Sequence, residues 1–120
     1  MTQRRLRVIL KGRALEEFKR LSALVEEQQK KGETNSQEMQ LLKSIQQKVE
    51  LLKLNPVYGK KVPHALIPKN LDVSNLFRVS LTNYWRMLYS LEGNQVEVIA
   101  FILYILDHAR YDKLFGYRKK

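Results

Sequence analysis

The sequence predicts an α+β fold in which an antiparallel helical hairpin packs on one face of a small, mostly antiparallel four-stranded sheet. Three observations predict it: a short β-branched segment near the N-terminus, two stretches with apolar residues at three- and four-residue steps, and three later segments of alternating or continuous apolar character. A helical hairpin must bury its apolar face, and one face of the sheet is the large apolar surface available for this.

The N-terminal part predicts a strand followed by a helix. Residues 5–10 are short and rich in β-branched and aliphatic side chains, and Lys11-Gly12 ends them, which is typical of a strand. The period then changes, and charged residues surround an apolar stripe made of Ala14, Phe18, Leu21 and Val25. We expect Gly32 to end this amphipathic helix.

A second helix follows and completes a hairpin over residues 14–54. Asn35 and Glu38 have the spacing of a capping box, in which each side chain satisfies a backbone N–H of the first turn. The apolar stripe then repeats at Leu42, Ile45, Val49 and Leu52. Asn55-Pro56 should end the helix, because the residue before a proline is disfavoured in the α region.

The remaining chain divides into a loop, a strand meander and a tail. Residues 55–75 hold all three prolines and several cations, and we expect a long basic loop there. The meander covers 76–107. In residues 76–81 and 85–91 apolar and polar side chains alternate, and a turn at 82–83 separates the two segments. Residues 96–106 are apolar at both odd and even positions, as in a strand that is covered on both faces. A short tail or helix over 108–120 ends the chain and bounds the sheet face that we expect to be left for a ligand.

Length and composition limit the chemistry. The 120 residues predict one domain, and 22 Lys and Arg against 12 Asp and Glu give a net charge of +10. The absence of cysteine excludes disulfides, thiolate zinc sites and cysteine nucleophiles, and two histidines offer little for a metal, so no metal or cofactor is expected. The charge favours nucleic acid, a nucleoprotein particle or an acidic protein as partner; the alternative is a basic surface that only keeps the protein soluble.

A cytoplasmic protein without membrane contact is expected. The start of the sequence lacks the apolar core of a signal peptide. The longest apolar run, 98–106, is about half of the length that crosses a bilayer.

Strand parity separates a core face from a polar face. Trp85, Met87, Tyr89 and Leu91 share the face that we expect to meet the helices, which leaves Arg86 on the opposite face. By the same parity, Arg78 of the preceding strand lies on the face of Arg86. An arginine amid apolar strand residues is costly to desolvate without a partner. The structural alternative for Arg86 is a cross-strand ion pair, for example with Glu97.

These cations suit metal-independent RNA cleavage, which needs a base near the ribose 2′-OH, charge stabilisation at the phosphorus and an acid for the leaving 5′-oxygen. Arg78, Arg86 and the loop lysines Lys60, Lys61 and Lys69 offer positive charge, while His108 and Tyr111 offer proton transfer or base stacking. Each also has a structural interpretation: a solvated strand or loop for the cations, and capping or packing for His108, Tyr111 and Tyr117.

The strings at 75–81, 84–89 and 106–113 resemble the RelE/ParE toxin superfamily, and the resemblance covers nearly the whole chain. It implies a RelE-like toxin of a type II toxin–antitoxin pair, which cuts mRNA in the ribosomal A site by metal-independent attack of a 2′-OH. The implied partners are the ribosome, mRNA and a RelB-like antitoxin with an extended, acidic segment, with a toxin–antitoxin heterotetramer as one assembly.

The resemblance also implies functional positions. Arg86 matches the family's phosphate-binding arginine, and the catalytic set becomes Arg86, His108, Arg110 and Tyr111. The positions expected to contact RNA are Arg78, Lys60, Lys61, Lys69, Lys113 and Tyr117. Ser80 departs from the pattern, since the ribosome-dependent prototype has a second lysine there, and the hairpin and the basic loop are longer than in compact members. The alternatives are a ParE-like protein that acts on DNA gyrase and a catalytically inactive relative held by an antitoxin.

Overall fold

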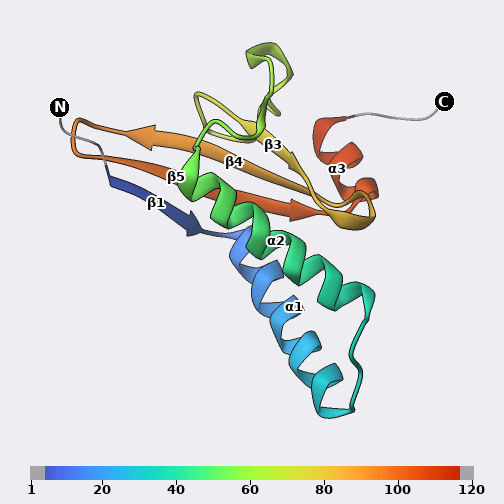
Figure 1. The fold of residues 1–120 in the computed structure, drawn as a ribbon. Helices are drawn as coiled ribbons and strands as arrows, with labels where there is room; N and C mark the ends of the chain where they lie inside the picture. The colour runs from blue at the N-terminus through green and yellow to red at the C-terminus, as the bar shows by residue number, and fades with distance from the viewer. Residues whose placement is uncertain (1–4, 117–120) are drawn as a thin grey trace.

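The computed structural model describes residues 5–116 and has an α+β fold (Figure 1). The helices and strands are β1 (Arg5–Leu10), α1 (Arg13–Lys30), α2 (Gln37–Leu54), β2 (Lys60–Lys61), β3 (Phe77–Ser80), β4 (Arg86–Gly93), β5 (Glu97–Leu106) and α3 (His108–Phe115), with 3₁₀ turns η1 (His64–Leu66) and η2 (Thr82–Tyr84). No helix in this part of the chain is both long and apolar enough to cross a membrane.

The sheet has five strands in the order β1-β5-β4-β3-β2, where four were expected. β1 runs parallel to β5, and the other neighbours are antiparallel. The additional strand is β2, two residues of the expected basic loop, which pair with β3 so that Lys60 lies opposite Arg78. β2 begins here because Tyr89 of β4 holds Gly59, the residue just before β2, by a hydrogen bond.

The helix ends agree with the sequence except at the start of α2. Gly32 adopts φ 84° just after α1, and α2 stops before Pro56. Ser36, rather than Asn35, caps α2, because its Oγ accepts a hydrogen bond from the Met39 N–H at 3.0 Å. Glu38 does not complete a capping box: it accepts a hydrogen bond from Gln28 of α1 at 2.8 Å, which also holds the pKa of Glu38 below its ordinary value.

α1 and α2 pack on one face of the sheet, and β4 presents Met87 and Tyr89 to them. The fully or nearly buried residues of this first core are Ala14, Leu21, Leu41, Ile45, Leu52, Phe77, Val79, Leu81, Met87, Tyr89, Ala100, Ile102 and Ile105. A register shift in β5 places Tyr104 opposite Leu88 but Ile102 opposite Tyr89. This one-residue bulge lets both Ile102 and Ile105 face the helices.

From the sequence we expected the opposite sheet face to be left for a ligand, but in the structure this face carries a second core. α3 and the segment that contains η1 lie on this side, away from α1 and α2 (Figure 1). Together with the sheet they form a second core of Val62, Leu76, Leu88, Leu106 and Tyr111. The cause is the apolar character of β4 and β5 on this face too, which must be covered.

The expected tail is a short helix from its first residue. Asp107 caps α3 by accepting a hydrogen bond from the Arg110 N–H at 2.8 Å, and Gly116 ends it with φ 76°. Tyr117, one of the expected RNA contacts, lies outside the described residues.

Tyr89 anchors the loop that leads into β2. Its ring is fully buried and stacks on Phe77 with ring centroids 5.1 Å apart. Its hydroxyl donates to the Pro56 carbonyl at 2.7 Å and accepts from the Gly59 N–H at 2.9 Å. Burial raises the pKa of this hydroxyl. A Cβ on Gly59 would lie 2.8 Å from the tyrosine ring, so the close approach of the loop requires glycine at this position. Tyr89 therefore fixes where β2 begins.

Replacing Tyr89 by phenylalanine should lower the free energy of unfolding by about 1–3 kcal/mol, because the Gly59 N–H and the Pro56 carbonyl lose their shared partner. Urea unfolding followed by circular dichroism measures this. Tyr84→Phe is the matched control, since the Tyr84 side chain is exposed, and we expect a change below about 0.5 kcal/mol there. Equal effects of the two substitutions would contradict the anchoring role.

Candidate functional site

Two arginines of the second sheet face converge on one tyrosine of α3. Arg78 of β3 donates from Nη1 to the Tyr111 hydroxyl at 3.2 Å. The guanidinium carbon of Arg86, the first residue of β4, lies 5.7 Å from the centroid of the same ring, within reach of a cation–π interaction. We call Arg78, Arg86 and Tyr111 the arginine–tyrosine cluster.

The charge of Arg86 is not neutralised within residues 5–116. Its Nη1 donates to the Trp85 carbonyl at 3.2 Å, and its Nε is buried without a hydrogen-bond partner in that range. The cross-strand ion pair with Glu97 does not form, because Arg86 lies opposite Leu106 at the other end of β5, and Glu97 pairs with Arg7 at 3.5 Å. Arg78 also has no carboxylate within ion-pair distance in the described chain.

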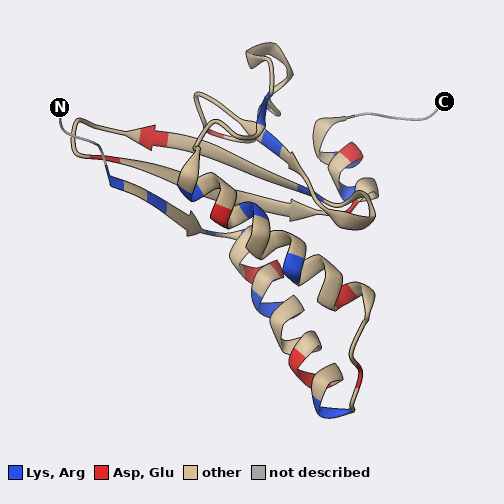
Figure 2. Cartoon of the chain, in the orientation of Figure 1, with Lys and Arg blue, Asp and Glu red and all other residues tan. Residues whose placement is uncertain are grey.

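A basic hollow of about 250 Å³ adjoins the cluster, and Figure 2 shows Lys and Arg on the strands that border it. Its cations are Lys60, Lys61 and Arg78, and Tyr111 and Phe115 of α3 supply an aromatic wall. Two of the predicted lysines therefore lie beside Arg78. Lys69 and Lys113 do not line this hollow; both are exposed, on the loop and on α3.

His108 and Tyr84 form a second group where α3 begins. His108 lies 3.2 Å from the Asp112 carboxylate through Nε2, and its ring meets Tyr84 edge-on with centroids 6.4 Å apart. Tyr84 is 75% exposed and has φ 64°, directly after Asn83 with φ 57°. Two consecutive non-glycine residues with positive φ are costly and are held only where the surroundings require them.

The turn around Tyr84 is held from both sides. The Leu81 N–H donates to the Trp85 carbonyl at 2.8 Å, and the Thr82 N–H donates to Ser44 Oγ of α2 at 3.2 Å. The sequence analysis did not single out Tyr84 as an exposed aromatic residue. The signal that could have found it is an aromatic residue next to Asn in a strand-to-strand turn.

Tyr111 is buried and Arg110 is held by other partners, so neither lies with Arg78 and Arg86 as a solvent-exposed group. Tyr111 is only 5% exposed and packs in the second core. Arg110 lies on the other side of the sheet's end, where its guanidinium sits 5.4 Å from the Trp85 ring and 3.6 Å from the Glu17 carboxylate. Arg86, Arg78, His108 and the two hollow lysines remain the groups best placed to meet a ligand.

The arrangement is suited to a polyanion. Guanidinium groups match phosphate oxygens in a bidentate way, and stacking on an aromatic ring fixes their direction in advance. Among residues 5–116, no group of three or more His, Asp or Glu could hold a metal ion. No family model, curated protein or solved structure matches the chain, so the geometry of the site is the basis on which function is inferred.

Tyr111→Ala should undock α3, because the ring fills part of the second core and binds both arginines. By analogy with other large-to-small core changes, we expect a loss of about 3–5 kcal/mol in the free energy of unfolding. Amide hydrogen exchange over 108–116 should rise strongly, while α1 and α2 change less. In Tyr111→Phe the ring remains and only the hydroxyl is lost, so protection of α3 should persist. Unchanged exchange in the alanine variant would contradict this docking role.

Proposed function

We propose that the chain is a RelE-like toxin that cleaves mRNA on the ribosome by metal-independent attack of a 2′-OH. The observation that carries the proposal is the arginine–tyrosine cluster, with two arginines on one sheet face that no carboxylate of residues 5–116 neutralises. An arginine whose Nε is buried without a partner is expensive to maintain, and a phosphate would supply the missing acceptor.

The fold supports the proposal. A strand, two helices, an antiparallel meander and a short C-terminal helix follow each other in the order that the resemblance to the RelE/ParE superfamily implies. The fifth strand extends the sheet by two lysines at its edge and adds them to the same face region as Arg78. Fold alone does not decide between RNA cleavage and gyrase inhibition, so the site carries the choice.

The proposed reaction is a transesterification within the RNA. The 2′-oxygen forms a bond to the adjacent phosphorus while the bond from phosphorus to the 5′-oxygen breaks, which leaves a 2′,3′-cyclic phosphate and a 5′-hydroxyl. The 2′-OH gives up one proton and the departing 5′-oxygen takes one, so the net charge is conserved. Extra negative charge develops on the phosphate oxygens on the way, and fixed cations stabilise it.

The residues divide these tasks by position. Arg86 and Arg78 stabilise the phosphate, and Lys60 and Lys61 attract the RNA backbone along the basic hollow. His108 is the exposed group that can exchange a proton, held by Asp112 and next to the exposed Tyr84 ring, on which a base can stack. Tyr111 positions the arginines, and Arg110 positions α3.

The net charge supports the proposed partners. A protein with a charge of +10 is drawn to ribosomal RNA and mRNA, and equally to an acidic segment of a RelB-like antitoxin that would cover the same cations in the cytoplasm. Both kinds of partner compete for one surface in this proposal, so binding of the antitoxin would exclude RNA.

Arg86→Ala should reduce cleavage at least about 100-fold, because one fixed donor to the developing charge is typically responsible for that much. The assay adds the purified protein to ribosomes translating a defined mRNA and maps new 5′ ends. Naked mRNA is the control for ribosome dependence. Arg5→Ala is the control for a general loss of positive charge, because Arg5 lies beside the start of β5 whereas Arg86 lies beside its end. A folded Arg86→Ala protein that still cuts would refute the role of Arg86. Intact mRNA with the unmutated protein would refute the cleavage proposal, and supercoiling assays would then test gyrase.

His108→Ala should lower the single-turnover cleavage rate by about 100- to 10,000-fold, the usual contribution of one proton-transferring group. The pH–rate profile should also lose one of its limbs, which a purely structural role would not change. An unchanged pH profile in His108→Ala would contradict proton transfer by His108.

A further inference from the structure

The basic hollow beside Arg78 also has an apolar lining, to which the proposed cleavage reaction gives no role. The apolar and aromatic residues that line it are Val62, Pro63, Leu66, Tyr111 and Phe115. Val62 and Tyr111 are buried in the second core, whereas Leu66 is 52% exposed. Ligand sites combine apolar and aromatic walls with a few polar groups at fixed points, and this hollow has that composition.

The turn η1 holds Leu66 at a fixed position. The Leu66 N–H donates to the Pro63 carbonyl at 2.8 Å. Before the turn, the Val62 N–H donates to the Leu76 carbonyl at 2.9 Å, which continues the pairing of β2 with β3. After the turn, Ile67 packs against the second core. Since the chain is tied to the sheet on both sides of Leu66, a ligand that contacts this side chain orders little that is not already ordered.

The cations of the basic hollow have no acidic neighbour in it. They are Lys60, Lys61 and Arg78, and in the described part of the chain no Asp or Glu lines the hollow. Lys60 lies directly opposite Arg78 in the pairing of β2 with β3. Like charges at such a cross-strand pair repel each other. An anion bound beside both side chains would relieve this repulsion.

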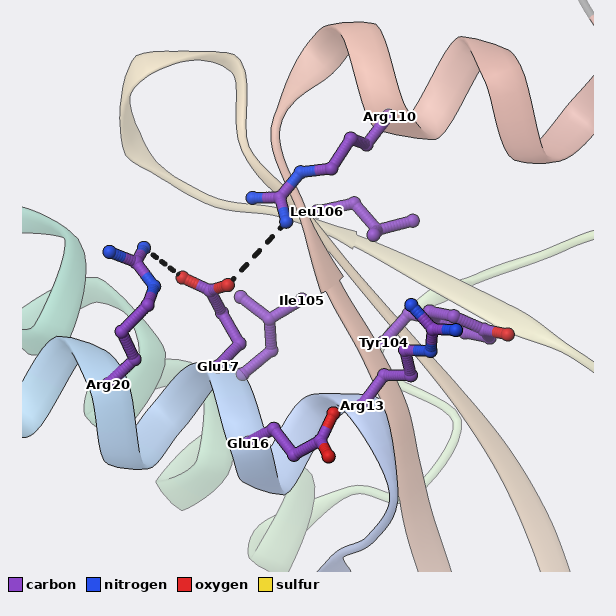
Figure 3. Close-up of a pocket in the computed structure, with 8 residues that line it drawn as sticks. All are labelled: Arg13, Glu16, Glu17, Arg20, Tyr104, Ile105, Leu106 and Arg110. Carbon is purple, nitrogen blue, oxygen red and sulfur yellow. Dashed lines mark hydrogen bonds and ion pairs between the residues drawn. The ribbon is translucent and has the colours of Figure 1, made fainter.

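A second hollow rich in arginine, between α1, the end of β5 and α3, is neutralised from within (Figure 3). Its charged lining residues are Arg13, Glu16, Glu17, Arg20 and Arg110. Glu17 binds both Arg20 and Arg110. Arg110 also pairs with Asp107 at 3.2 Å, so three carboxylates meet three arginines. No surplus charge remains there for a phosphate, which makes the surplus at Lys60, Lys61 and Arg78 a property of the basic hollow.

The basic hollow adjoins the proposed cleavage site. It shares Arg78 and Tyr111 with the arginine–tyrosine cluster, and Arg86 lies next to the ring of the same tyrosine. A phosphate held at Arg86 therefore has the hollow as its neighbour. The volume of about 250 Å³ is just below the range of about 300–1,000 Å³ that is usual for drug-sized ligands, so it suits a single ring system. Every nucleobase has a π-face that packs on such walls.

We propose that the basic hollow binds the base of a nucleotide next to the phosphate held at Arg86. The ring contacts Leu66 and Phe115, while Arg78 and the two lysines bind the backbone of the same strand. This inference rests on the proposed function and deepens it, because it assigns a base subsite beside the cleavage point. An acidic peptide with an apolar side chain has related chemistry, but the two residues shared with the arginine–tyrosine cluster favour RNA.

Binding of two single-stranded RNAs tests the inference with Leu66→Ala. Both are fluorescent 2′-O-methyl oligonucleotides of the same length, which lack the attacking hydroxyl; one carries uracil throughout and the other is abasic throughout. Fluorescence anisotropy gives each Kd. Leu66→Ala should weaken binding of the uracil RNA about four- to fifteen-fold, the effect of about one to two methyl groups that lose contact with a base. The Kd of the abasic RNA should not change. Leu66→Met, which keeps the volume, should restore most of the affinity.

Leu54→Ala is the matched control, because Leu54 is 84% exposed at the end of α2 and does not line the basic hollow. It should leave both Kd values unchanged, and thermal unfolding should be the same for Leu54→Ala and Leu66→Ala. Lys61→Ala reports backbone binding. It should weaken binding of both RNAs and reduce the slope of log K against log salt by about 0.7, the loss of one phosphate contact on a single strand.

The inference and the proposed function can fail separately, because the cleavage reaction does not use Leu66. Equal losses for the two RNAs in Leu66→Ala, or no loss for either, would overturn the inference and leave the cleavage reaction standing. A loss of affinity for an acidic peptide without any loss for RNA would overturn it in favour of a protein ligand. Intact mRNA in the ribosome assay with the unmutated protein would refute the proposed function and the inference with it.

Discussion

The ring of Tyr111 fills part of the second core and at the same time holds both arginines of that sheet face. Its edge carries the hydroxyl that accepts from Arg78, and its face lies next to the guanidinium of Arg86. Arginines beside an apolar core lose hydration, and only a nearby polar or π-electron group offsets that loss. The position of α3, the direction of the two arginines and the wall of the basic hollow therefore all depend on one side chain. A large aromatic residue with a hydroxyl meets these demands, whereas an aliphatic one meets only the packing demand.

The apolar character of β5 explains why α3 needs a large residue such as Tyr111. The apolar side chains of β5 point to both sides, so the sheet needs cover on both faces. α1 and α2 cover the first face, and the bulge at Leu103 keeps Ile102 and Ile105 turned towards them. The second face is left to a short helix and a loop, which are too small to cover it completely. The uncovered part is where β3 and β4 carry arginines instead of apolar residues, and it is consequently the place where a ligand can meet fixed charge.

The sequence was sufficient for elements that depend on local pattern. Both long helices, their breaks at Gly32 and Asn55-Pro56, and the parity of Met87 and Tyr89 follow from periodicity, which the structure keeps. Features that depend on distant contacts could not be predicted. Lys60 and Lys61 carry no strand signal, and they pair with β3 only because Tyr89 holds Gly59 in place.

The site residues divide in the same way. Arg78 and Arg86 share a face as the alternation required, whereas the burial of Tyr111 follows from the docking of α3, and the exposure of Tyr84 follows from a turn with positive φ. An eight-residue helix is too short to be stable by itself, so α3 exists because it is docked. Docking brings Tyr111 to Arg78 and Arg86 on one side and Arg110 to Glu17 on the other. The arginine–tyrosine cluster and the ion pair between Arg110 and Glu17 therefore both depend on the docking of α3, although they share no side chain.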